Sequence, residues 1–87
     1  MNNKIYYKFI CIDETHAIIA EQQLNNAETD KLKAKRLGRA VVVSIDNSDM
    51  EQNELSEINY LLSSVRVHAM AYEDELSQYD IDEVNKV

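Results

Sequence analysis

Three side chains near the N-terminus have the types that nucleophilic catalysis uses. Cys11 and His16 are five residues apart with Asp13 between them, so a thiol, a base and an orienting carboxylate could come within reach. The chain has a single glycine, Gly38, and therefore no glycine-rich loop to supply an oxyanion hole. We expect Cys11 to be a buried free thiol and the protein not to be an enzyme.

The residue types that bind transition metals are few and widely spaced. Cys11, His16 and His68 are the only cysteine and histidines, and they lack the paired close spacing of a zinc site. Residues 46–54, DNSDMEQNE, alternate oxygen-bearing side chains as a calcium loop does. They lack its central glycine and the glutamate at its twelfth position. We expect no metal and no cofactor, and we interpret the Asp and Ser residues as helix caps.

Five of the nine basic residues lie between residues 31 and 39, in KLKAKRLGR. On a helix, Lys31, Lys35 and Arg39 would share one face with Arg36 beside them, and these cations could contact a phosphate backbone. The stretch has no interleaved aromatic residues and no helix-turn-helix pattern. Cations near a helix C-terminus also stabilise the helix without a ligand. A regulatory nucleic-acid site at these four residues is therefore an alternative to a purely structural role.

The rest of the chain is acidic, and its charge is unevenly distributed. Residues 1–45 carry seven Lys or Arg against five Asp or Glu, whereas residues 46–87 carry two against eleven, and the net charge is −7. The electrostatic field of a negatively charged protein repels phosphate backbones and favours cationic partners. The residues that we expect to meet such a partner are Glu51, Glu54, Glu57, Glu73, Asp74, Glu75, Asp80, Asp82, Glu83, Tyr72 and Tyr79.

Aromatic and apolar residues alternate with the acids between residues 72 and 83, which a purely solubilising tail would not require. Carboxylates speed the encounter with a basic surface, and tyrosine rings supply burial energy. An amphipathic helix end that covers the protein's own core would show the same pattern. In size and charge class the chain is comparable to phage-encoded inhibitors of host defence nucleases, such as anti-CRISPR DNA mimics, and to bacteriocin immunity proteins.

Our hypothesis is therefore a small protein-binding module that blocks a cationic, nucleic-acid-binding site on a target such as a nuclease. The alternatives are a nucleic-acid-binding protein that uses the basic residues and a structural homo-oligomer subunit. In the latter, the basic stretch of one copy would meet the acidic stretch of another.

Local patterns predict the elements of the N-terminal half. Apolar and β-branched residues over residues 5–12 predict a strand that is covered on both faces. Asp13 or Thr15 can cap a helix, and apolar residues at helical spacing extend it to residue 27. A hairpin with residues 16–24 as the return strand is the alternative.

Two asparagines at residues 25–26 predict a bend, after which the helix restarts over residues 27–37. Gly38 is placed to end this segment, because glycine commonly follows the last turn of a helix. Residues 40–46, AVVVSID, predict a buried second strand.

The C-terminal half keeps helical spacing for nearly thirty residues. Ser48 or Asp49 can cap this helix, and the apolar positions continue to Leu76. A break at residues 63–64 is the alternative, with residues 65–72 forming a third strand.

Together these elements predict one α+β domain over residues 1–87: a strand, a bent helix, a strand, and a long or broken acidic C-terminal helix. Residues 77–87 form either a flexible acidic tail or a final short helix. A chain of this length buries about 60 to 65 per cent of its unfolded surface, so we expect a homodimer to supplement the marginal core. No apolar run reaches the roughly 20 residues of a membrane span. The first residues lack a signal-peptide pattern, so we expect a cytoplasmic protein.

Overall fold

The computed structural model describes residues 3–73 and 75–87. Its four strands form one antiparallel sheet in the order β2-β3-β1-β4. The elements in chain order are β1 (Lys4–Cys11), α1 (Glu14–Asn25), β2 (Leu32–Leu37), β3 (Ala40–Asp46), α2 (Gln52–Val65), the short 3₁₀ helix η1 (Arg66–His68), β4 (Ala69–Glu73) and α3 (Gln78–Val84). The predicted α+β class is confirmed.

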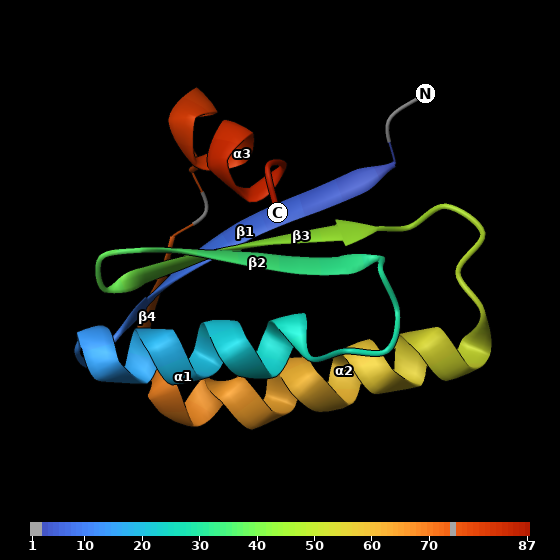
Figure 1. Cartoon of the computed structure of the whole chain (residues 1–87), viewed down its shortest axis with the longest axis horizontal. Helices are drawn as coiled ribbons and strands as arrows, with labels where there is room; N and C mark the ends of the chain where they lie inside the picture. Colours follow the sequence, from blue (N-terminus) through green and yellow to red (C-terminus); the bar gives the residue numbers. More distant parts are fainter. Residues whose placement is uncertain (1–2, 74) are drawn as a thin grey trace.

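The helices cover the sheet from both sides. α1 and α2 lie side by side on one face, and α3 lies on the opposite face against β3 and β2 (Figure 1). The first six main elements follow the order βαββαβ, and with this strand order they have the connectivity of the split βαβ, or ferredoxin-like, arrangement, to which α3 is added. Within the described ranges, no helix has the length and hydrophobicity needed to cross a lipid bilayer.

The main core lies between the sheet and the α1–α2 layer. Phe9 and Val43 from the sheet, and Leu24 and Ile58 from the two helices, are at most 2% exposed. Full burial of a side chain of this size stabilises the fold by about 1.5 to 3 kcal/mol. On the other face, Val84 of α3 is completely buried and so anchors the helix there.

The first strand and first helix agree with the sequence prediction. β1 lies between β3 and β4, which fits a strand that is largely apolar on both faces. α1 begins after Asp13, whose carboxylate accepts the backbone N–H of His16 at 2.9 Å. Ala17 and Leu24 of this helix are completely buried. The alternative in which the segment returns as a hairpin strand is wrong.

The prediction of a second helical segment over residues 27–37 is wrong. α1 ends at Asn25, and Leu32–Leu37 form β2, which pairs antiparallel with β3. Leu32 and Ala34 are buried in the core in strand alternation. Gly38 does not end a helix; it has a φ of 66° and is the first residue of the two-residue turn between β2 and β3, as in type II′ hairpins. Pairing with β3 outweighs the helix propensity of lysine, arginine and alanine.

The prediction of one helix that continues to Leu76 is also wrong, and the alternative with a strand is correct in part. α2 begins after Glu51, not after Ser48 or Asp49, and ends at Val65 rather than at the serine pair. A thirty-residue helix would extend about 45 Å and leave one side of β1 without a partner. The break instead lets β4 return and pair antiparallel with β1.

Residues 77–87 contain the short helix that the sequence offered as one alternative for this segment. Ser77 caps α3, and its hydroxyl accepts the backbone N–H of Asp80 at 3.2 Å. The Asp80 carboxylate in turn accepts the backbone N–H of Ser77 at 3.1 Å. This reciprocal capping box begins the helix, and the burial of Val84 fixes it to the sheet.

Candidate functional site

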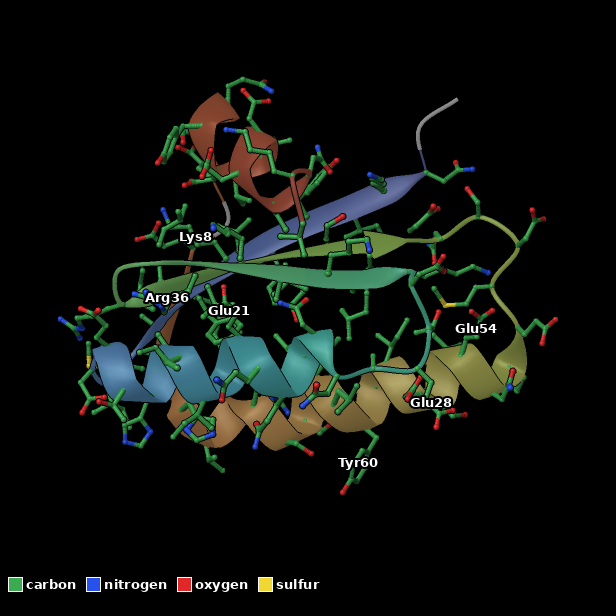
Figure 2. The ribbon with its side chains drawn as sticks, in the orientation of Figure 1. Lys8, Glu21, Glu28, Arg36, Glu54 and Tyr60 are labelled. Carbon is green, nitrogen blue, oxygen red and sulfur yellow. The ribbon has the colours of Figure 1, made fainter. Side chains whose placement is uncertain are left out.

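An open hollow of about 600 Å³ lies between the loop after α1 and the first turns of α2. Carboxylates dominate its lining, which consists of Glu28, Thr29, Glu51, Asn53, Glu54 and Glu57. Glu28 and Glu54 are labelled at this end of the helix layer in Figure 2. An open polar hollow of this kind suits a charged group that reaches in from solvent, whereas small organic ligands usually occupy enclosed and mostly apolar pockets.

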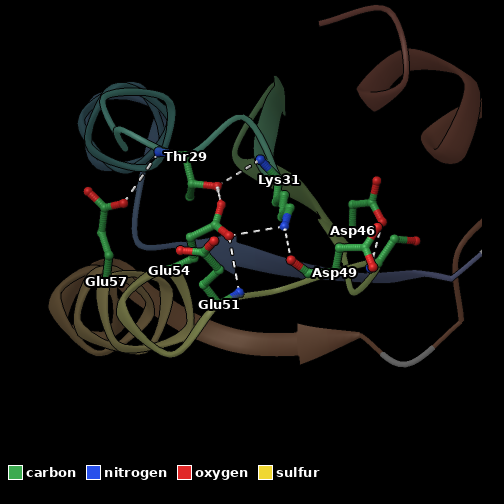
Figure 3. A network of polar contacts seen from close by, with 8 residues as sticks. Thr29, Lys31, Asp46, Asp49, Glu51, Glu54 and Glu57 are labelled. Atoms are coloured by element: carbon green, nitrogen blue, oxygen red, sulfur yellow. Dashed lines mark hydrogen bonds and ion pairs between the residues drawn. The ribbon is translucent and has the colours of Figure 1, made fainter.

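Glu54 is held in the wall of the hollow by three donors (Figure 3). Its Oε2 accepts the Thr29 hydroxyl at 2.6 Å, and its Oε1 accepts the Lys31 ammonium at 3.0 Å and the Glu51 backbone N–H at 3.1 Å. These donors, the Thr29 hydroxyl foremost, lower the pKa of Glu54 to about 2. The Lys31 ammonium also donates to the Asp49 carbonyl oxygen at 2.6 Å. Glu54 is therefore ionised, and Lys31 already matches its charge.

The other carboxylates of the hollow have no cation beside them in the part of the chain that the structure describes. Both oxygens of Glu57 accept backbone N–H groups, from Glu28 at 3.0 Å and Thr29 at 3.4 Å, which ties the loop to α2. Neither Glu28, Glu51 nor Glu57 forms an ion pair with any residue of 3–73 or 75–87. Of four carboxylates, Lys31 matches one, and three remain without a counter-ion among these residues.

The predicted acidic residues of β4 and α3 lie elsewhere on the molecule. α2 and α3 lie on opposite faces of the sheet (Figure 1), and the hollow is lined by the start of α2, so the acids of the hollow and those of α3 do not form one surface. Lys8 of β1 forms ion pairs with Asp80 at 3.2 Å and with Glu73 at 3.3 Å. The Asp80 side chain is only 7% exposed, and that of Glu73 is 46% exposed. Two carboxylates expected to face a partner therefore meet a cation of the protein itself.

The pKa values of this ion pair shift in the direction that keeps both groups charged. Burial alone would raise the pKa of Asp80, but the Ser77 backbone N–H and the Lys8 ammonium outweigh it and lower that pKa. Burial alone would lower the pKa of Lys8, but Asp80 and Glu73 outweigh it and raise that pKa. The pair is thus an internal contact between β1 and α3.

The remaining acids of the segment differ in their exposure and partners. Glu83 pairs with Lys86 at 2.6 Å. Asp82 is exposed, and its carboxylate accepts a hydrogen bond from the side-chain amide of Gln78, one turn earlier in α3. Glu75 is exposed and forms no ion pair with the described residues. Asp74 lies outside the described residues.

The two predicted tyrosines are both exposed but lie on different elements. Tyr79 on α3 is 62% exposed, and Tyr72 on β4 is 55% exposed. The Tyr72 ring centroid is 6.0 Å from that of Phe9, so its ring lies beside the main core. The tyrosines and acids of this segment therefore lie in different environments and do not form one binding face.

The four predicted basic residues do not form one surface either. Lys31 pairs with Glu54 in the wall of the hollow, and Lys35 lies on the α3 side of the sheet, opposite Val42. Arg36 bonds to a carboxylate of α1 at 3.2 Å. Arg39 in the hairpin turn donates to the Cys11 carbonyl oxygen at 3.0 and 3.2 Å. They are separated because the segment is a strand and a turn, so the shared helix face predicted for them does not exist.

A histidine pair was not predicted from the sequence. His16 on α1 and His68 in η1 are 52 positions apart, yet their Nδ1 atoms are 2.8 Å apart. One ring donates to the other, so only one of these two nitrogens carries the proton. Within 3–73 and 75–87, no three metal-binding side chains come together. Cys11 is completely buried, as predicted, and burial raises the pKa of its thiol.

Comparison with known proteins found no matching family model, no similar curated protein and no similar solved structure. The function must therefore be inferred from the geometry and charge of the residues described above.

Proposed function

We propose that this protein is a small non-enzymatic binding module that holds a cationic group of another protein in the hollow at the start of α2. The observation that carries the proposal is the set of three carboxylates, Glu28, Glu51 and Glu57, that line one hollow without a counter-ion among the described residues. Lys31 and Glu54 match each other and fix the wall behind them. The site therefore has one wall held by an ion pair, and its other carboxylates have no counter-ion among the described residues.

The choice of a cationic partner follows from charge. The net charge of −7 repels phosphate groups and attracts basic surfaces at long range. Each exposed ion pair contributes only about 0.2 to 1 kcal/mol. Three such pairs give modest affinity, so apolar contacts must supplement them. Leu55 and Tyr60 of α2 are 40% and 71% exposed and can supply such contacts.

The target that best fits these features is a protein whose cationic site ordinarily holds nucleic acid, such as a nuclease. Lysine or arginine side chains of that site would enter the hollow and would then be unable to reach phosphate groups. A phage-type inhibitor or an immunity protein acts in this way. The small size and acidity of the chain support this finer proposal, and the position of the unneutralised carboxylates supports the choice of surface.

The first test uses a short arginine-rich peptide as the cationic probe. We expect NMR titration at low salt to shift the amide signals of Glu28, Glu51 and their neighbours. The variant Glu28→Gln/Glu51→Gln should weaken peptide binding about tenfold, as the loss of two partly cooperating ion pairs implies. The control variant Glu75→Gln/Asp82→Asn removes two exposed carboxylates from the other side of the sheet and changes the net charge equally.

The two double variants separate a local site from the overall field. An equal loss of affinity in both would show that the peptide responds to net charge alone, and the proposed site would be wrong. The natural target is then sought by capture from the native cell or its host. A captured protein supports the finer proposal if duplex DNA or RNA displaces it from the wild-type chain and if Glu28→Gln/Glu51→Gln fails to capture it.

A further inference from the structure

A second open hollow, of about 320 Å³, lies where the last turns of α2 meet strands β1 and β4. We call it the tyrosine hollow; its lining consists of Tyr7, Asn59, Leu62, Ser63, Arg66 and Tyr72. Its volume is at the lower end of the range of about 300 to 1,000 Å³ in which proteins bind small molecules. None of these lining residues is acidic, whereas four carboxylates line the hollow at the start of α2. The two hollows therefore suit ligands of opposite charge.

The fold brings the lining of the tyrosine hollow together from two sides. Starting from Asn59, the residues from the helix lie at positions i, i+3, i+4 and i+7 of α2 and its C-cap, so they share one side of the helix. Tyr72 of β4 pairs with Phe9 of β1, and Tyr7 is two positions before Phe9. Residues that pair, or that are two positions apart on a strand, lie on the same face of a sheet. One wall of the tyrosine hollow is therefore helical, and the other consists of two tyrosines.

The polar side chains of the tyrosine hollow are donors without a partner in the described part of the chain. The Arg66 guanidinium forms no ion pair and no hydrogen bond with the described residues. The same holds for the side chains of Asn59, Ser63, Tyr7 and Tyr72. Burial, and to a smaller extent the neighbouring Tyr72, raises the pKa of Tyr7 well above its ordinary value. Its hydroxyl therefore keeps its proton at neutral pH and can donate to an anion.

A carboxylate is the anion that best fits these groups. A guanidinium can bind a carboxylate through two parallel hydrogen bonds, and nearby hydroxyl and amide groups can donate further ones. Arg66 supplies one positive charge, which matches the single negative charge of a carboxylate. A phosphate monoester carries about 1.5 to 2 negative charges at neutral pH, so the net charge of −7 repels it more strongly.

The apolar surfaces of the tyrosine hollow indicate what the carboxylate is attached to. The Phe9 ring has its centroid 6.4 Å from that of Tyr7 and 6.0 Å from that of Tyr72, so the three rings form a row across the sheet. Aromatic rings attract each other at such distances. Tyr72 is 55% exposed, and Leu62 is half-buried. A ring placed against these two side chains would extend the row and cover apolar surface that now meets water.

We propose that the tyrosine hollow binds a small aromatic carboxylate, whose ring lies against Tyr72 and Leu62 and whose carboxylate accepts hydrogen bonds from Arg66 and the Tyr7 hydroxyl. This site is separate from the hollow at the start of α2 and does not depend on the function proposed for it. Arg66 is also the C-cap of α2, where a positive charge stabilises the helix end. That role requires only the charge, whereas carboxylate binding uses the planar guanidinium.

The first experiment titrates the full chain with benzoate at constant ionic strength and follows the amide signals by NMR. We expect the signals of Ser63, Arg66 and Tyr72 to shift and to saturate, with a dissociation constant in the millimolar range because the hollow is open. Benzyl alcohol has the ring without the charge, and acetate has the charge without the ring. Each should bind at least about tenfold more weakly than benzoate. Inorganic phosphate should also bind more weakly than benzoate.

The second experiment measures benzoate binding to four variants. Arg66→Gln should weaken it about tenfold or more, because the charge-assisted hydrogen bonds are lost. Lys35→Gln is the matched control, since it changes the net charge equally from the other face of the sheet, and it should bind as the wild type does. Arg66→Lys keeps the charge at the helix end and should bind several-fold more weakly with unchanged thermal stability. Tyr7→Phe keeps the ring, removes the donor and should also bind several-fold more weakly.

Several results would overturn the proposal. The first is a wild type whose signals around the tyrosine hollow do not shift, or shift without saturation. Equal affinities of Arg66→Gln and Lys35→Gln would show that benzoate responds only to net charge. Full affinity in Arg66→Lys would leave Arg66 only its role at the helix end. Tighter binding of phosphate, or of benzyl alcohol, would contradict the choice of a carboxylate, and this comparison needs only the wild-type chain.

Discussion

The ion pair between Lys8 and Asp80 joins β1 to α3, and Lys8→Met tests how much it contributes to holding α3 on the sheet. Methionine keeps most of the apolar stem and removes the ammonium. Asp80 is 7% exposed on its side chain, so the loss of this charge-assisted hydrogen bond costs about 1.5 to 3 kcal/mol. The contact to Glu73 adds less than about 1 kcal/mol, because that carboxylate is 46% exposed. We expect a total loss of about 2 to 3 kcal/mol.

This loss should appear in α3 before it appears in the whole domain. The apolar anchor of the helix is the completely buried Val84, which contributes about 1.5 to 3 kcal/mol. Losing a contact of the same size should let α3 leave the sheet while β1 and β3 stay paired. Hydrogen exchange with mass spectrometry should show protection of residues 78–84 reduced about 30- to 150-fold, and protection of β3 unchanged.

Two further variants make this reasoning refutable. Lys35→Met makes the same chemical change on the α3 side of β2, where the lysine forms no ion pair with the described residues, and it should leave exchange unchanged. Lys8→Met/Asp80→Asn removes both charges and should recover part of the lost protection, as a coupled pair requires. If Lys8→Met exchanges like the wild type, or if Lys35→Met has an equal effect, the ion pair does not hold α3.

Three other predictions concern the turn, the hollow and the core. Gly38→Ala forces a residue with a side chain to a φ of 66°, so the free energy of unfolding should fall by about 1 to 2 kcal/mol in urea titration, although a Cβ there meets no other atom. The pKa of Glu54 is lowered to about 2, so its stabilising effect is complete above the unfolded value near 4.3 and is lost as pH falls toward 2. Glu54→Gln should therefore show a shallower loss of stability than the wild type across this acidic range, measured by thermal unfolding at stepwise lower pH. The completely buried Cys11 thiol should react with Ellman's reagent only as fast as the protein unfolds.

Local patterns were enough to predict the elements in which residue types, capping residues and apolar spacing all favour the same structure. β1 is rich in aromatic residues and isoleucine, β3 is rich in β-branched residues, and α1 has a capping aspartate at Asp13 and an apolar face. The sequence LKAKRL has good helix formers throughout, and its strand structure depends on pairing with β3 across the turn at Gly38. Apolar residues that alternate with lysines over residues 32–35, followed by a glycine and an apolar run over residues 40–43, were a signal for this hairpin, and helix propensity concealed it.

The candidate site was harder to predict because the fold brings together charged residues that are far apart in the sequence. Glu54 and Glu57 were expected to face a partner, and only the fold shows that Lys31 matches the first and that backbone N–H groups hold the second. Glu28 was not expected at all, because it lies in a loop that the sequence assigned to a helix. The pairing of Lys8 with Asp80 joins residues 72 positions apart, so no local pattern contains it.

The magnitudes also indicate which acidic surface is available to a partner. For Asp80 to bind a cationic protein, it would have to leave Lys8, at a cost of about 1.5 to 3 kcal/mol. A new surface ion pair would return only about 0.2 to 1 kcal/mol. Glu28 and Glu51 release no described ion pair when a cation arrives, so every new contact there adds to affinity. Binding at the hollow is therefore favoured over binding at Asp80, even though the sequence places more carboxylates in the C-terminal segment.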